Sequence, residues 1–131
     1  MVNESTFARQ SLREYYLCMT LADHEKNDAF RKNLEELART AREEFDFWAR
    51  KSGIRGDEVQ ISRIETWFFL RMRALLGLSF TAKYIVKRKK KSVAAYMQYC
   101  SACNVDADGR AVTTFIERLQ SISERLEKEC L

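Results

Sequence analysis

Apolar positions recur every three to four residues along the first half of the chain, which is the spacing of amphipathic helices. One pattern predicts a helix over residues 5–23, and a second predicts a helix over residues 28–51. Asn27 is a candidate N-terminal cap for the second helix, and Gly53 stands where a glycine commonly follows a helix C-terminus. The short connections around these helices predict antiparallel neighbours.

The second half of the chain predicts a longer and less regular helical region. This region runs from about residue 57 to residue 103, and a loop over 104–109 precedes a last helix over 110–129. Gly77 lies inside it, and because glycine disfavours a helix interior, we expect a bend or break between residues 77 and 91. The predicted fold class is all-α, an up-down four-helix bundle with a bent or broken third helix.

Composition agrees with one globular helical domain over residues 1–131. Hydrophobic residues make up 46% of the chain and charged residues 32%, and the absence of proline favours long helices. The start of the chain has no charged-then-apolar signal pattern. The uncharged stretch 74–82 is far shorter than the roughly 20 residues that cross a bilayer. We therefore expect a soluble, cytoplasmic protein.

Several short motifs together resemble the ferritin-like domain of rubrerythrin-like proteins and of the cytosolic part of the vacuolar-iron-transporter family. The motifs are Leu21-Ala22, Leu34-Glu35-Glu36-Leu37-Ala38, Phe47-Trp48, Gly53, Leu75-Leu76-Gly77-Leu78-Ser79-Phe80 and Ala95-Tyr96. The resemblance implies a bundle in which two helices each supply a Glu, and two others each supply Glu-x-x-His, to a di-iron centre. It also implies pairing of two such domains.

Most ligands implied by the resemblance are absent from this chain. The first-helix Glu falls on Ser11, and the third-helix Glu falls on Ala94. The Glu and His of the second-helix motif fall on Ala41 and Glu44. Small residues therefore replace three ligands, and we expect neighbouring aromatic side chains to fill the centre.

The last helix leaves two registers open. In one, the Glu-x-x-His motif becomes Glu117 and Gln120, and in the other it becomes Ser123 and Leu126. Neither contains histidine, because the only histidine of the chain is His24, in a predicted turn. We therefore expect no bound metal, with Glu44 and Glu117 as the residual candidates for a metal site.

One run of the sequence is uniformly basic, where the similar family is rich in Glu. It consists of Lys87, Arg88, Lys89, Lys90 and Lys91. One interpretation is a site for an anionic partner, namely nucleic acid, a phospholipid membrane surface or an acidic protein. The other is a solvated helix segment.

Residues 67–80 carry too many apolar side chains for a helix that is exposed on one side. They form either core or a homodimer face, and the resemblance favours the homodimer. Cys100 and Cys103 have the spacing of half a zinc site or of a redox pair, but buried free thiols are the preferred interpretation.

The sequence predicts a degenerate ferritin-like domain without di-iron catalysis that serves as a self-associating structural or interaction module. No Ser/His/Asp or Cys/His arrangement favours an enzyme. One alternative is a protein that handles iron or another metal with an atypical carboxylate site built from Glu44, Glu117 and either Glu14 or Glu43. A second alternative is a binder of nucleic acid or phospholipid through residues 87–91. No cofactor is expected unless the metal alternative holds, in which case it is iron.

Overall fold

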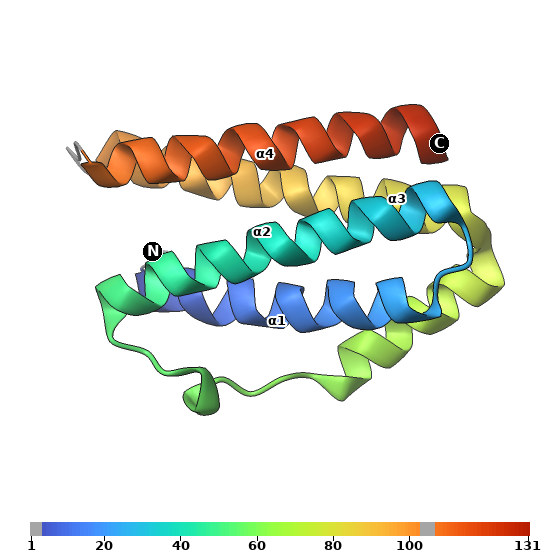
Figure 1. Ribbon diagram of the computed structural model, residues 1–131, viewed down its shortest axis with the longest axis horizontal. Helices are drawn as coiled ribbons and strands as arrows, with labels where there is room; N and C mark the ends of the chain where they lie inside the picture. Colours follow the sequence, from blue (N-terminus) through green and yellow to red (C-terminus); the bar gives the residue numbers. More distant parts are fainter. Residues whose placement is uncertain (1–3, 103–106) are drawn as a thin grey trace.

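The computed structural model describes residues 4–102 and 107–131 and is all-helical over them (Figure 1). Its elements are α1 (Glu4–His24), α2 (Asp28–Ser52), the short 3-10 helix η1 (Gly56–Glu58), α3 (Arg63–Ala102) and α4 (Ala107–Cys130). The all-α prediction is confirmed, and the first two helices begin and end within one residue of their predicted limits.

Both predicted ends of α2 are confirmed by their capping geometry. The Asn27 side-chain oxygen accepts a hydrogen bond from the backbone N–H of Phe30 at 2.9 Å, which satisfies one of the free donors at the start of the helix. Gly53 has φ 78°, and its N–H donates to the carbonyl of Ala49 at 2.8 Å. A short polar turn before Asp28 makes α1 and α2 an antiparallel pair (Figure 1).

The connection from α2 to α3 differs from the short antiparallel turn that the sequence predicts. Helix α3 begins only at Arg63, after Ser62 whose hydroxyl accepts a hydrogen bond from the N–H of Glu65 at 3.1 Å. Residues 63–76, which we call the α3 arm, cross back along the bundle (Figure 1). Helix α2 and the part of α3 after the arm therefore run in the same direction, and α4 returns antiparallel to that part (Figure 1).

Gly77 makes the predicted bend in α3. Its backbone angles are φ 90° and ψ 176°, a combination that essentially only glycine adopts. Beyond the bend the chain folds back, so that the rings of Phe69 in the arm and Tyr84 after the bend lie 5.6 Å apart. The hydroxyl of Thr81 donates to the carbonyl of Gly77 at 2.9 Å and supports the start of the second segment.

The last helix starts earlier than the sequence predicts. Helix α4 already includes residues 107–109, which the sequence predicts to be loop. Gly109 does not break the helix, because it does not have the positive φ of a helix-ending glycine. The rest of the predicted loop, and Cys103, lie outside the described residues.

The core is built around Trp48 of α2, which is completely buried. Its ring contacts Phe7 of α1 at 4.7 Å and Tyr99 of α3 at 5.0 Å between ring centroids. These contacts join three helices at one end of the bundle. Within the described parts of the chain, no helix combines the length and the apolar character that crossing a bilayer requires.

Candidate functional site

The inward faces of α1, α2 and α3 bring polar side chains together in the middle of the bundle. Residues three, four or seven positions apart share one side of a helix, which places Ser11 with Glu14 on one face of α1 and Lys89 with Tyr96 on one face of α3. The set, which we call the central cluster, consists of Ser11 and Glu14 of α1, Glu44 of α2, and Arg88, Lys89 and Tyr96 of α3.

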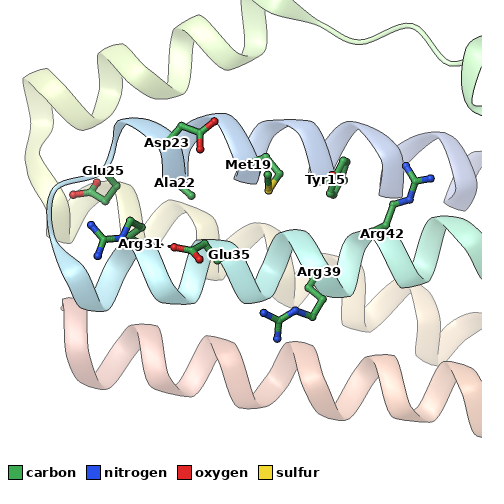
Figure 2. Close-up of a pocket in the computed structure, with 9 residues that line it drawn as sticks. All are labelled: Tyr15, Met19, Ala22, Asp23, Glu25, Arg31, Glu35, Arg39 and Arg42. Atoms are coloured by element: carbon green, nitrogen blue, oxygen red, sulfur yellow. Dashed lines mark ion pairs between the residues drawn. The ribbon is translucent and has the colours of Figure 1, made fainter.

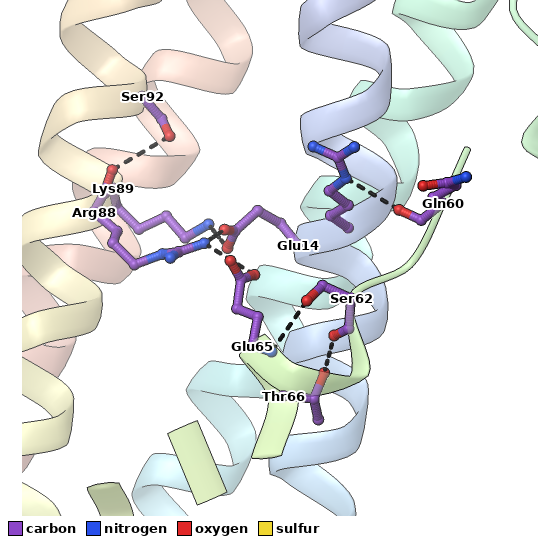
Figure 3. Close-up of polar contacts among 9 residues, drawn as sticks. Glu14, Gln60, Ser62, Glu65, Thr66, Arg88, Lys89 and Ser92 are labelled. Atoms are coloured by element: carbon purple, nitrogen blue, oxygen red, sulfur yellow. Dashed lines mark hydrogen bonds and ion pairs between the residues drawn. The ribbon is translucent and has the colours of Figure 1, made fainter. Parts of the chain in front are cut away.

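A buried ion pair forms the middle of the central cluster. The Lys89 ammonium nitrogen lies 2.7 Å from Oε2 of Glu14, and Arg88 donates to Oε1 of the same carboxylate. Arg88 also reaches Glu65 of the α3 arm at 3.7 Å, which ties the arm to the bundle (Figure 3). Lys89 is only 4% exposed, so its charge belongs to the interior.

Both members of this ion pair are charged at neutral pH. Burial alone would raise the pKa of Glu14, but Lys89 and Arg88 together lower that pKa to about 2. Burial alone would lower the pKa of Lys89, but Glu14 raises it above its usual value. Each charge therefore compensates the cost of burying the other.

A second part of the cluster surrounds the Tyr96 hydroxyl. This hydroxyl accepts a hydrogen bond from Nε1 of Trp48 at 3.3 Å and is hydrogen-bonded to Glu44 and Ser11. Burial raises the pKa of Glu44 to about 7, although Lys89 and the Tyr96 hydrogen bond act in the opposite direction. Burial also raises the pKa of Tyr96, so its proton stays available for the hydrogen bond.

The residues of the central cluster do not fit a di-iron centre. Such a centre takes four carboxylates and two imidazoles. Here both oxygens of Glu14 already bind cationic side chains, and Glu44 is the only other carboxylate in the cluster. No group of three or more His, Cys, Asp or Glu side chains in the described residues is placed to hold a metal ion.

The structure separates the residual metal candidates. Ser11, Ala41 and Glu44 are buried, as the resemblance implies for ligand positions. Glu117 is exposed, so it does not converge with Glu44.

Ala94, the third-helix ligand position, is also exposed, and its predicted place at the centre is wrong. The buried side of α3 follows Ile85, Lys89, Val93 and Tyr96, and position 94 lies about 100° around the helix from position 93.

The basic run does not form one surface. Because an α-helix turns about 100° per residue, five consecutive side chains point in all directions. Lys89 is buried and Arg88 is half-buried, both on Glu14. Lys90 is exposed and pairs with Glu127 at 3.2 Å. Lys87 and Lys91 are exposed, so the predicted anion site of five side chains is reduced to two of them on one side of the helix.

The remaining single candidates show no further chemistry. His24 is exposed, and its Nδ1 lies 2.9 Å from the carbonyl oxygen of Thr20. Cys18 and Cys130 are buried free thiols, and Cys100 is a half-buried one. Burial raises the pKa of Cys18 to about 12, so it remains a thiol.

Two of the hollows on the surface of the described bundle lie beside residues discussed above. A cleft of about 470 Å³ between α1 and α3 leads from Gln10 and Arg13 at its rim to the central cluster. A groove of about 650 Å³ between α1 and α2 is lined by side chains of both charges (Figure 2). In it Arg31 lies 3.6 Å from Glu35, and Arg42 lies over the ring of Tyr15 at 5.6 Å.

Sequence reasoning missed the internal role of Lys89 and the polar role of Tyr96. The available signal was register: Lys89 and Tyr96 are seven residues apart and share a face with Ile85 and Val93, both buried. A lysine on the apolar side of a predicted helix needs a carboxylate partner, and Glu14 occupies the matching level of α1.

No model of a protein family, no curated protein and no solved structure matches the chain.

Proposed function

We propose that the chain is a ferritin-like bundle in which the central cluster replaces a di-iron centre, and that it works as a non-catalytic structural or interaction module. The observation that carries the proposal is the Lys89–Glu14 ion pair in the middle of the bundle, at 2.7 Å. In a di-iron centre the metal ions balance the negative charge of the bridging carboxylates. In the central cluster an ammonium group balances the carboxylate charge instead. A metal would have to displace Lys89 and Arg88 from Glu14 and leave both cations buried without their partner.

The order of the helices supports the ferritin-like part of the proposal. Two antiparallel pairs joined by one long crossover are typical of ferritin-like folds. Here the crossover consists of η1 and the α3 arm, and it joins the α1–α2 pair to the pair formed by the later part of α3 and α4 (Figure 1).

An exposed apolar surface on and beside the α3 arm supports the role as an interaction module. We call it the α3 face. It consists of Ile64, Trp67, Phe68, Leu75, Leu76 and Phe80, and their exposed fractions range from 48% to 81%. Self-association through residues 67–80 stays a prediction, because exposure alone does not select the partner.

A metal-handling function is the competing proposal. Its strongest form uses Glu14 and Glu44, which share the central cluster. Both oxygens of Glu14 bind cations, which favours the metal-free function. Glu117 does not contribute to this form, because it is exposed.

Iron analysis of the purified protein tests the proposal. The full chain is produced with iron supplementation, and its metal content is measured beside that of Glu44→Gln, with Glu35→Gln as a matched exposed control. We expect no stoichiometric iron in any of the three proteins. About two irons per chain, lost in Glu44→Gln and kept in Glu35→Gln, would show a di-iron site in the cluster and overturn the proposal.

A further inference from the structure

The α3 face is larger than an ordinary exposed apolar patch. The exposed fractions of its six members lie between 48% and 81%. With about 200 Å² of surface for each large apolar side chain, these fractions together correspond to roughly 700 Å² of exposed apolar surface. Monomeric proteins rarely expose contiguous apolar patches of more than a few hundred Å². The face therefore needs a partner.

The inner side of the same arm is well packed, so the exposure of the outer side does not come from a detached helix. Phe69 is 1% exposed and Met72 is 5% exposed. Arg73 binds the buried carboxylate of Glu25 through two hydrogen bonds of 2.8 Å and 3.1 Å. The arm is held against the bundle, and only its outer stripe faces solvent.

The exposed charges that α3 itself places beside the α3 face have one sign. Between Glu65 and Asp106 the sequence contains no acidic residue. Exposed cations accompany the apolar side chains both in the arm and after the bend, namely Arg63, Arg71, Lys83 and Lys87. Glu65 itself is half-buried and lies 3.7 Å from Arg88.

The nearest exposed carboxylates on the crossover already have a cationic partner within it. Asp57 and Glu58 of η1 lie 3.5 Å and 3.0 Å from Nε of Arg55.

A second copy of the chain fits this face poorly. In a symmetric dimer the same patch meets itself, so Arg63 and Arg71 of two copies would face each other across an apolar surface that offers no carboxylate. Like charges brought together in this way oppose association. The charge pattern thus disfavours the homodimer.

We propose that the α3 face docks onto the surface of a membrane that contains anionic phospholipid. A Trp, Phe and Leu stripe accompanied by Lys and Arg is the combination with which interfacial helices insert their apolar side and attract anionic headgroups. The inference rests on the proposed function as an interaction module and names its partner. It also gives Lys87 of the basic run a role, whereas Lys89 and Arg88 serve the interior.

Vesicle flotation of the purified full chain tests the inference. The vesicles contain phosphatidylcholine alone or phosphatidylcholine mixed with phosphatidylserine. We expect flotation with the mixed vesicles, little with phosphatidylcholine alone, and a decrease at high salt. Trp67→Glu and Leu75→Glu should abolish flotation. Met19→Glu, an exposed apolar position in the groove between α1 and α2, is the matched control and should float like the wild type.

A milder set of variants tests the role of the cations. Lys83→Gln and Lys87→Gln should each weaken binding to phosphatidylserine vesicles about five-fold. This measurement, and the comparison of the two vesicle types, do not depend on the folding of the glutamate variants.

Three results would overturn the inference. The first is no flotation with either vesicle type. The second is flotation that Trp67→Glu and Leu75→Glu leave unchanged. The third is a dimer that forms without lipid and that these two variants dissociate, which would make the face an interface between copies. An iron-loaded chain that still floats would overturn the proposed function alone, and an iron-free chain that does not float would overturn the inference alone.

Discussion

The central cluster and the α3 face reverse the usual distribution of side chains. Lys89 carries a charge in the interior at 4% exposure, whereas Leu75 places an apolar side chain in solvent at 76% exposure. The charged side chain has a carboxylate partner, Glu14, at 2.7 Å, whereas most of the apolar one is in contact with solvent. The comparison teaches that the buried charge is compensated within the chain, and that the apolar exterior is the region where we propose that a partner acts.

Two adjacent phenylalanines of the α3 arm give the largest expected contrast. Phe69 is 1% exposed and Phe68 is 49% exposed, so the same substitution tests the inside and the outside of one helix. Phe69→Ala should lower the free energy of unfolding by about 3–5 kcal/mol, and Phe68→Ala by less than about 1 kcal/mol. Urea denaturation measures both. Equal losses of stability in the two variants would contradict an arm with a buried inner side and an exposed outer side.

The pH dependence of stability tests the polar half of the comparison. The pKa of Glu44 rises from 4.5 to about 7 on folding, so the folded state favours its protonated form. The contribution of Glu44 to the free energy of unfolding should therefore be complete below about pH 4.5 and should be lost as the pH rises through 7. The loss should reach roughly 3 kcal/mol once Glu44 is ionised.

Glu14 acts with the opposite sign. Its pKa falls to about 2 on folding, so its contribution is present above pH 4.5 and is lost as the pH drops toward 2. The two groups together predict a maximum near pH 4.5 to 5. Glu44→Gln should remove the decline in stability between pH 5 and 8. If stability declines in that variant as it does in the wild type, the decline is caused by other groups.

The bend at Gly77 connects the two regions, because it returns the chain from the arm to the bundle. Gly77→Ala should cost about 1–3 kcal/mol through backbone strain alone, since nothing lies within 4 Å of the added methyl group. Gly109→Ala is the matched control, because it also adds a methyl group to open space but lies in regular helix, where it should stabilise by about 0.5–1 kcal/mol. Thermal melts measure the stability of both variants. A gain in stability for Gly77→Ala would contradict the claim that alanine is strained at this position.

Helix limits could be predicted well where the signal is local. Asn27 and Gly53 act through their own backbone and immediate neighbours, so the ends of α2 follow from the sequence. Gly77 likewise marks the bend. The crossover could not be predicted, because the position of the arm depends on contacts between distant residues, such as Arg73 with Glu25 and Arg88 with Glu65.

The site could be predicted only in part, for a related reason. Periodicity places Ser11 and Ala41 on the inner faces of their helices, and the resemblance places Glu44 there; all three are buried. The basic run hides the stripe of α3, since five consecutive cations look like a surface feature. Only the register with Tyr96 and the partner Glu14 on another helix shows that Lys89 is internal.

A double-mutant cycle on Glu14 and Lys89 tests the central claim most directly. Glu14→Met leaves Lys89 buried without its partner and should cost about 3–5 kcal/mol, whereas the double substitution with Lys89→Met removes both charges and should recover much of that loss. The predicted coupling energy, from urea unfolding of the four proteins, is at least about 2 kcal/mol. Additive effects of the two substitutions, with a coupling energy near zero, would contradict an interior held together by this ion pair.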